Sequence, residues 1–289
     1  MGRDVKVLQT LPDARQLMLK GFRTAMKRPD VSAGLPDRSV MVLDHRPDLA
    51  RAAEYARVCG FSVRDEVPAT WLHVQTFPLQ MWVMGQPDFP FSLAGLVHVS
   101  NDMTLHRPVR ADERLRLTVA AANLQPHKRG TAFDLKGTVH VGEELVWEGT
   151  SNYLSTKAKM PGQAPEPERL EMPSPSTGSG NVEASQLWRL PADLGRQYAK
   201  VSGDWNPIHL HPLTARLFGF PRPIIHGMWT HARSLAAFGG ALPDRYRVQV
   251  QFTKPILLPG KVGFIVDGEK FAVVDKEGKP KLVGALIDG

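Results

Sequence analysis

The chain has 289 residues, of which 42% are hydrophobic and 22% charged, a composition typical of a soluble protein with one large or two ordinary domains. The net charge is +7, but the basic residues are dispersed and do not alternate with aromatic ones, which argues against a nucleic-acid partner. No apolar run approaches the roughly 18 residues of a membrane span. A lone cysteine, Cys59, excludes an intramolecular disulfide, so we expect a cytoplasmic protein.

In the first half of the chain, helices are predicted before strands. The first forty or so residues carry no recognisable motif, although residues 14–26 have a weak helical pattern. An apolar stretch at 77–85 predicts a central helix. Alternating apolar and polar residues then predict strands at 98–109 and 115–119.

A proline-rich segment separates the two halves. Five prolines and several serines between residues 159 and 183 form neither helix nor strand readily, which predicts a linker crossing the surface. Gly178-Ser179-Gly180 lacks the third glycine of a dinucleotide-binding loop and belongs to this linker. We therefore predict an N-terminal half at 1–158 and a C-terminal half at 184–289.

The second half repeats the order of helices before strands. Helices are predicted up to Val201, at 213–217 and at 226–238, the last ending at a pair of glycines. Strands are predicted at 245–255, 261–267, 271–275 and 281–287. Helices followed by strands, rather than alternating with them, favour an α+β fold with an antiparallel sheet.

Matches between the halves indicate an internal duplication. Residues 55–60 (Y-A-R-V-C-G) match 198–203 (Y-A-K-V-S-G) at an offset of 143. Further along, Arg107-Pro108-Val109 matches Lys254-Pro255-Ile256 at an offset of 147.

A match between two histidines predicts where the two halves differ most in length. His73 matches His226 at an offset of 153, so the first copy is expected to be about ten residues shorter between Gly60 and this histidine. Phe61 stands where the second copy has Asp204. We therefore expect the first half to be catalytically inactive.

The segment 198–209, Y-A-K-V-S-G-D-W-N-P-I-H, concentrates groups that can handle protons. Gly203 can leave the preceding helix with a positive φ, and Asn206 is pushed to extended geometry by the proline that follows it. On such a turn Asp204 and His209 can face one cavity, where a carboxylate and an imidazole suit acid–base chemistry near neutral pH. The alternative is that Asp204 and Asn206 are ordinary turn and helix-capping residues.

This segment resembles the hydratase-2 motif of the MaoC-like, (R)-specific enoyl-CoA hydratases, and the duplication resembles the double hot-dog arrangement in that family. The resemblance implies two antiparallel sheets, each wrapped round a central helix and paired as an intrachain pseudo-dimer. It implies reversible hydration of trans-2-enoyl thioesters to (R)-3-hydroxyacyl thioesters in fatty-acid metabolism. No metal or cofactor is implied beyond coenzyme A or acyl carrier protein as the carrier of the substrate.

The resemblance also assigns roles to residues. Asp204 and His209 would hold the water, with either as base, and Asn206 would orient them. The backbone N–H of Gly227 would stabilise the enolate, because a glycine at a helix start exposes a donor at the positive end of the dipole. Expected substrate contacts are Tyr198, His226 and Met228. Apart from the resemblance, the first half around 77–91 is expected to set the depth of the pocket, with Trp82 as a substrate contact and Met84 and Phe89 beside it.

Other functions are open at this point. The hot-dog fold also carries thioesterases, and a protein that only binds acyl-CoA could keep the turn for structure. His209-x-His211 with Asp204 nearby could bind a metal, although the H-E-x-x-H pattern of a catalytic zinc helix is absent. The two halves already form one pseudo-dimer, so either a monomer or a homodimer is expected.

Overall fold

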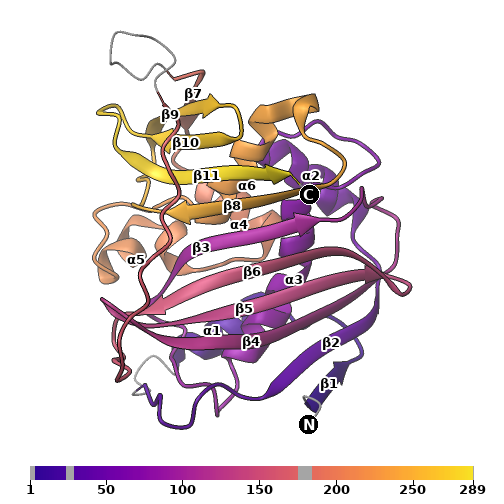
Figure 1. The fold of residues 1–289 in the computed structure, drawn as a ribbon, viewed down its shortest axis with the longest axis vertical. Coiled ribbons are helices and arrows are strands. Elements are labelled where there is room, and N and C mark those ends of the chain that lie inside the picture. Colours follow the sequence, from indigo (N-terminus) through magenta and orange to yellow (C-terminus); the bar gives the residue numbers. More distant parts are fainter. Residues whose placement is uncertain (1–3, 24–28, 175–183, 289) are drawn as a thin grey trace.

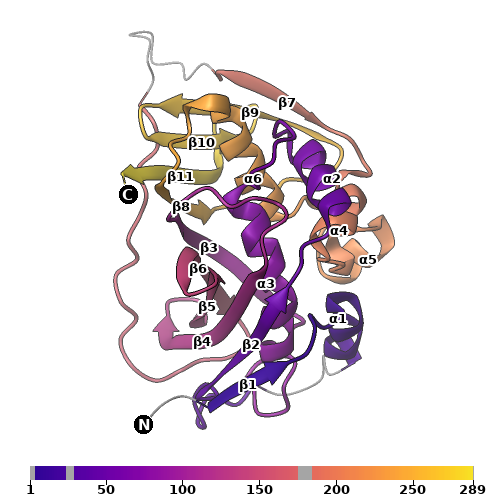
Figure 2. The same ribbon diagram turned by 90° about the vertical axis from the view of Figure 1, so that its right-hand side faces the viewer.

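The computed structural model describes residues 4–23, 29–174 and 184–288. One sheet of eleven strands curves around two central helices, α3 (Ala69–Met84) and α6 (Gly227–Phe238), with the smaller helices on the same side (Figures 1 and 2). The strand order is β1-β2-β4-β5-β6-β3-β8-β11-β10-β9-β7. Every neighbouring pair is antiparallel except β1 and β2. The predicted α+β double hot-dog fold is therefore confirmed, with the two sheets joined into one.

The elements of the two halves follow the chain in a similar order. Besides α3, the first half contains β1 (Asp4–Leu8), α1 (Ala14–Arg23), β2 (Arg38–His45), α2 (Leu49–Cys59), β3 (Leu96–Leu105), β4 (Leu115–His127), β5 (Gly130–Val141) and β6 (Glu144–Ser155). Besides α6, the second half contains β7 (Gln186–Leu190), α4 (Leu194–Ser202), η1 (Pro207–His209), α5 (Pro212–Leu217), η2 (Gly239–Ala241), β8 (Tyr246–Phe252), β9 (Gly260–Asp267), β10 (Lys270–Val274) and β11 (Pro280–Asp288).

The duplication predicted from sequence is visible in the sheet. The order β2-β4-β5-β6-β3 in the first half mirrors β7-β9-β10-β11-β8 in the second. The halves join where β3 and β8 pair antiparallel, from Ser100 opposite Gln251 to Leu105 opposite Tyr246. The strand that begins each copy of the repeat, β2 or β7, was not predicted, and neither was β1, which lies outside the repeat.

The matched segments 55–60 and 198–203 are equivalent ends of α2 and α4. Both helices stop at a glycine in the left-handed region, Gly60 at φ 82° and Gly203 at φ 79°. A side chain is strained in this conformation, whereas glycine adopts it readily. The rings of Tyr55 and Tyr198 lie 6.0 Å apart, so the two helices meet through the same residue type.

The prediction that His73 is the counterpart of His226 is wrong. The N–H of Val67 donates to the carbonyl of Val109 at 2.9 Å, and the N–H of Ile225 donates to that of Ile256 at 2.9 Å. Because these bonds are equivalent, the residue that follows Val67, which is Pro68, corresponds to His226.

His73 lies instead on the second turn of α3, where its counterpart on α6 is His231. The extra segment of the second half is accordingly longer than predicted. It runs from Asp204 to Ile225, against 61–67 in the first half, and it contains η1 and α5.

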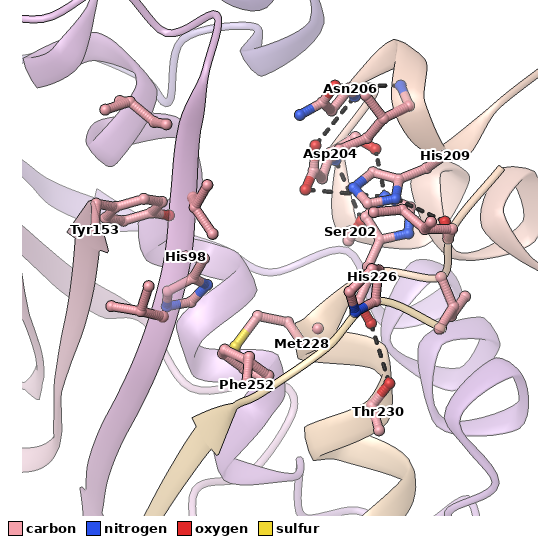
Figure 3. Close-up of a pocket in the computed structure, with 18 of the residues that line it drawn as sticks. His98, Tyr153, Ser202, Asp204, Asn206, His209, His226, Met228, Thr230 and Phe252 are labelled. Atoms are coloured by element: carbon pink, nitrogen blue, oxygen red, sulfur yellow. Dashed lines mark hydrogen bonds and ion pairs between the residues drawn. The ribbon is translucent and has the colours of Figure 1, made fainter. Parts of the chain in front are cut away.

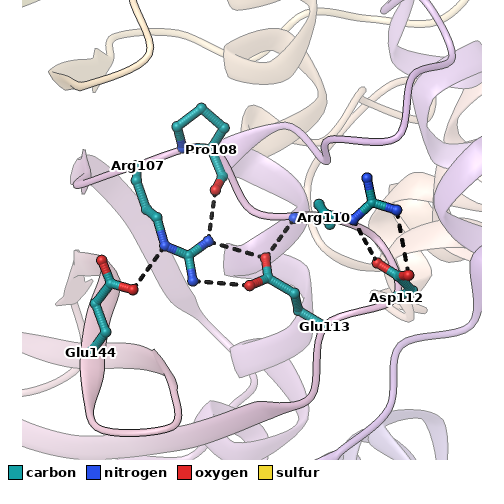
Figure 4. Close-up of polar contacts among 6 residues, drawn as sticks. All are labelled: Arg107, Pro108, Arg110, Asp112, Glu113 and Glu144. Atoms are coloured by element: carbon teal, nitrogen blue, oxygen red, sulfur yellow. Dashed lines mark hydrogen bonds and ion pairs between the residues drawn. The ribbon is translucent and has the colours of Figure 1, made fainter.

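The loop between β3 and β4 is held by the side chain of Arg107 (Figure 4). Its guanidinium donates to both carboxylate oxygens of Glu113 at 2.9 and 3.0 Å and to Glu144 at 2.9 Å. Glu113 also accepts from the N–H of Arg110 at 2.7 Å. The counterpart of Arg107 in the second half is Lys254, which is exposed at the mouth of a cavity.

The described part of the predicted linker, 159–174, crosses the face of the sheet opposite to the helices (Figure 1). The side chain of Gln251 donates to the carbonyl of Glu168 at 2.6 Å and accepts from the N–H of Leu170 at 3.2 Å. Glu171 forms an ion pair with Lys270. Gly178-Ser179-Gly180 lies outside the described residues.

None of the helices in the described part of the chain is long and apolar enough to cross a membrane.

Candidate active site

A cavity of about 560 Å³ lies between the two halves (Figure 3). The predicted catalytic residues line one part of it, and they are Asp204, Asn206, His209 and Gly227. Apolar side chains of the first half, including Val74, Phe77, Met81 and Met84, line another part. The cavity therefore joins the polar turn of one half to the apolar interior of the other.

The turn that follows α4 is built from its own polar groups. The N–H of Asp204 donates to Ser202 Oγ at 3.2 Å, and its carboxylate Oδ1 accepts from the N–H of Asn206 at 3.1 Å. Asn206 Oδ1 in turn accepts from the N–H of Ile208 at 3.3 Å and caps η1. Asn206 thus has the capping role considered from the sequence, and it also lines the cavity.

His209 is held in one orientation with one nitrogen available. Its Nδ1 lies 2.8 Å from the carbonyl oxygen of Ile224, and because a carbonyl only accepts, Nδ1 carries the proton in the neutral ring. The lone pair of that neutral ring is then on Nε2. The side chain is 7% exposed, so little solvent competes for it.

His226 supports the turn from the start of α6. Its Nε2 donates to the backbone carbonyl of Asp204 at 3.0 Å and lies 3.8 Å from the Asp204 carboxylate. Its ring stacks on that of His209 with centroids 3.6 Å apart. His226 was predicted to bind substrate; the structure places it against the cavity but 2% exposed, where it fixes both catalytic residues.

Burial moves the protonation equilibria of Asp204 and His209 towards each other. Desolvation raises the pKa of Asp204 above 3.8, and the His209 charge and the Asn206 N–H oppose the shift only partly. Desolvation lowers the pKa of His209 below 6.5, against the opposing influence of Asp204. The raised pKa makes the Asp204 carboxylate a better proton acceptor and the lowered pKa makes a protonated His209 a better proton donor, which favours acid–base chemistry on this turn.

Gly227 begins α6 beside the catalytic turn. The first N–H groups of a helix have no partner within it, so this donor is free to face the cavity that Gly227 lines. A Cβ at this position would lie 3.0 Å from the ring of Phe252. The close approach of α6 and β8 therefore favours glycine here.

The remaining predicted contacts divide into two groups. Tyr198 and Met228 line the cavity, and the Tyr198 ring lies 4.8 Å from that of His226. Trp82 is not among the described residues that line it, although Met81 and Met84 are. Successive residues of a helix point about 100° apart, which places Trp82 on another face of α3. The prediction for Trp82 was wrong because the register of α3 could not be fixed from its apolar sequence.

The metal site considered from the sequence does not form with His211. That residue is exposed and its Nδ1 accepts from the N–H of Leu213 at 3.2 Å, so it caps α5. Potential ligand atoms of Asp204, His209 and His226 do lie within 4.8 Å of one another. That the site works without a metal stays a prediction.

Sequence reasoning missed a residue of the first half that supports the catalytic turn. Arg51 of α2 donates from Nε to the carbonyl of Val201 at 2.8 Å, at the last turn of α4. Its guanidinium also lies 3.3 Å from the place of a Cβ on Gly203. Arg51 and Val201 are 150 positions apart, and no local pattern indicates such a contact.

The mouth of the cavity is basic. Arg129 and Lys254 are exposed at its edge, and Lys281 lies beside them in an ion pair with Asp275. Arg129 belongs to the first half and the two lysines to the second, so both halves contribute to the entrance.

Comparison with known proteins places the chain in a family. Residues 171–283 match a family described as the MaoC like domain. The chain is 35% identical over 264 residues to 3-hydroxyacyl-thioester dehydratase X of Mycobacterium tuberculosis, covering 90% of this chain and 91% of that relative.

Two further comparisons agree. Over 104 residues, 35% of this chain and 78% of the relative, it is 32% identical to the (R)-specific enoyl-CoA hydratase of Aeromonas caviae. The crystal structure of HtdX of Mycobacterium tuberculosis superimposes with a TM-score of 0.74 at 33% identity, covering 86% of this chain and 99% of that one. The chain belongs to the MaoC-like family of hydratases and dehydratases.

Proposed function

We propose that this protein is a hydro-lyase that adds water to trans-2-enoyl thioesters to give (R)-3-hydroxyacyl thioesters, or removes it in the reverse direction, in fatty-acid metabolism. The observation that carries the proposal is the convergence of the Asp204 carboxylate and the His209 imidazole on one cavity beside the start of α6. The similarity to a 3-hydroxyacyl-thioester dehydratase and an (R)-specific enoyl-CoA hydratase supports the same reaction class.

The two groups divide the proton transfers of one addition. Water lies between the carboxylate of Asp204 and Nε2 of His209, and one of them removes its proton as oxygen bonds to the β-carbon. The other delivers a proton to the α-carbon, so the enzyme ends with the number of protons it began with. Negative charge on the thioester oxygen is stabilised by the N–H of Gly227.

His226 and Asn206 keep this arrangement in place. Both make hydrogen bonds within the turn, and His226 holds the carbonyl of Asp204. Burial lowers the pKa of His226 well below 6.5, so it stays neutral and positions the turn without competing for the transferred proton.

The carrier of the acyl group is anionic in this proposal. Arg129, Lys254 and Lys281 at the mouth suit the phosphates of coenzyme A or of the arm of acyl carrier protein. Either carrier enters from this edge and directs the acyl chain inward. No additional cofactor takes part.

The test is the loss of enoyl absorbance with crotonyl-CoA and trans-2-octenoyl-CoA, with chiral analysis of the product. Formation of the (R)-alcohol by the wild-type protein is expected. Release of free thiol without hydration would identify a thioesterase, and tight binding of acyl-CoA without turnover would identify a binding protein. The assay is then repeated with thioesters of acyl carrier protein, the other proposed carrier. Either result contradicts the proposal if these thioesters give it as well.

A further inference from the structure

Helix α1 lies outside the duplicated fold and yet reaches the active site. The repeat begins at β2 and β7, so α1 has no counterpart in the second half. It packs against the central helix α3 of the first half (Figure 2). Because α1 is present in only one copy of the duplicated fold and lies beside the active site, its contacts with the residues of the site indicate what it does there.

The start of α1 touches the catalytic turn. The guanidinium of Arg15 lies over the ring of Trp205, 4.9 Å from its centroid, and Trp205 stands between Asp204 and Asn206. The Cβ of Ala14 is 3.8 Å from the place of a Cβ on Gly203. The helix is thereby fixed against the residues that carry the chemistry.

The next turn of α1 enters the cavity wall. Met18 is 6% exposed and lines the cavity together with Met81 and Met84, which are 5% and 3% exposed. Arg129 and Lys254, which also line the cavity, are exposed. The cavity therefore combines exposed basic lining residues with a buried apolar end formed by the three methionines, and α1 contributes Met18 to that end.

The packing at that end leaves little space between α1 and the rest of the wall. A Cβ on Gly21 would lie 2.1 Å from Cδ1 of Leu93, another residue of the cavity lining. The backbone of α1 at Gly21 thus lies in direct contact with the side chain of Leu93. This contact holds α1 against the segment between α3 and β3 that carries Leu93.

We propose that α1 determines the length of the acyl chain that the enzyme accepts, with Met18 as the residue against which the end of the chain packs. The proposal rests on the proposed function, because it takes the cavity to be the acyl site. Basic residues hold the charged carrier at the mouth, the thioester lies at the catalytic turn, and the aliphatic chain extends along α3 towards Met18.

The test compares Met18→Trp, which fills the apolar end, with Met18→Ala, which enlarges it without risk of overpacking. Leu19→Trp is the matched control, since Leu19 is the next residue of α1 and is 58% exposed. For each variant, kcat/KM is measured with crotonyl-, trans-2-octenoyl- and trans-2-hexadecenoyl-CoA. Binding of butyryl-, octanoyl- and palmitoyl-CoA is measured by calorimetry, which does not depend on turnover.

Met18→Trp is expected to lower the ratio of hexadecenoyl to crotonyl activity by about tenfold or more, because each methylene kept from an apolar wall costs roughly fourfold in affinity. Met18→Ala is expected to move the preference towards the longer chains. The profile of Leu19→Trp should match that of the wild type.

The two readouts separate this proposal from the proposed function. Hydration with the same chain-length profile in both Met18 variants and in the control would overturn the role of α1 and leave the hydratase assignment standing. Absence of hydration, with binding profiles that shift as expected, would support α1 and reject the hydratase. If neither acyl-CoA nor the corresponding acyl carrier protein thioesters bind, both are rejected.

Discussion

The two halves differ most between the end of the first helix and the start of the central helix. In the first half this connection is 61–67, whereas in the second it is the long segment from Asp204 to Ile225. Both connections begin after a left-handed glycine and end at equivalent backbone hydrogen bonds. The proposed catalytic residues therefore lie on a longer connection within a scaffold that both halves keep.

The first half lacks each catalytic group at the equivalent place. Phe61 follows the helix-ending glycine, and Pro68 and Ala69 stand where the second half has His226 and Gly227. Its remaining contribution is to shape the cavity and to support the other half's turn through Arg51. In the proposed mechanism the second half supplies the catalytic groups, and both halves line the cavity.

The largest effect is expected from Asp204→Asn. Removing one proton-transfer group should lower kcat for crotonyl-CoA hydration by about a thousandfold. The absorbance assay measures this, and circular dichroism should show an unchanged fold because the amide still accepts from Asn206.

The comparison of the halves supplies the control. Phe61→Asp in the background of Asp204→Asn should restore no activity, because the first half has no counterpart of His209. Recovery of even a few per cent of wild-type hydration would mean that the first half keeps a latent site.

A smaller loss is expected from Gly227→Ala. The added methyl group meets the Phe252 ring at 3.0 Å, so α6 or the ring must move and the backbone donor with it. Displacements of this kind cost roughly tenfold to a hundredfold in kcat. The matched variant Ala69→Gly should keep wild-type kcat and lose at most about 1 kcal/mol of stability; equal kcat for the two variants would argue against a role for the Gly227 N–H.

The raised pKa of Asp204 predicts a pH-dependent gain in stability for Asp204→Asn. The folded state holds the Asp204 proton more tightly than the unfolded state, so this group's contribution to stability is greatest below pH 3.8 and is lost as pH rises through the raised pKa. The variant should therefore resist urea better than the wild type at neutral pH, and the gap should narrow towards pH 3.8. A gap that widens on acidification would show that the carboxylate stabilises the fold.

The smallest effect is expected from Arg51→Met, which keeps the length of the side chain and removes its hydrogen bond to Val201. The loss should be about 1–2 kcal/mol of unfolding free energy, with a modest fall in kcat as the end of α4 loosens. Arg57→Met on the same helix, with Arg57 64% exposed and paired to Glu54, should change stability by less than about 0.5 kcal/mol. Equal losses of unfolding free energy in the two variants would argue against a special role for the hydrogen bond of Arg51.

The fold was predictable because local signals repeated. The glycine after each first helix and the alternating strands recur in both halves, and both signals reflect backbone requirements that do not depend on distant contacts. Strand β7 was missed because it is a short edge strand whose apolar residues lie on both faces: Trp188 and Leu190 are buried, whereas Leu187 is 81% exposed, which hides the alternation.

The site was predictable only in part. Asp204, Asn206 and His209 share one turn, and sequence spacing sufficed to bring them together. The wrong pairing of His73 with His226 rested on a single shared residue type. The true correspondence is given by the backbone hydrogen bonds of Val67 and Ile225, which the sequence does not reveal. Arg51 and Arg15 contact residues that are far from them in the sequence. The spacing of residues along the chain does not indicate such contacts.

The linker across the outer face of the sheet has a consequence for how the enzyme responds to dilution. The two halves belong to one covalent chain, and residues 159–174, which follow the first half, are fastened to β8 and β10 by Gln251 and Lys270. The association of the halves is therefore governed by an effective concentration rather than by the amount of protein in solution. Two separate hot-dog chains would fall apart as they are diluted. In this chain the junction of β3 and β8, and the cavity that spans it, persist in a single molecule.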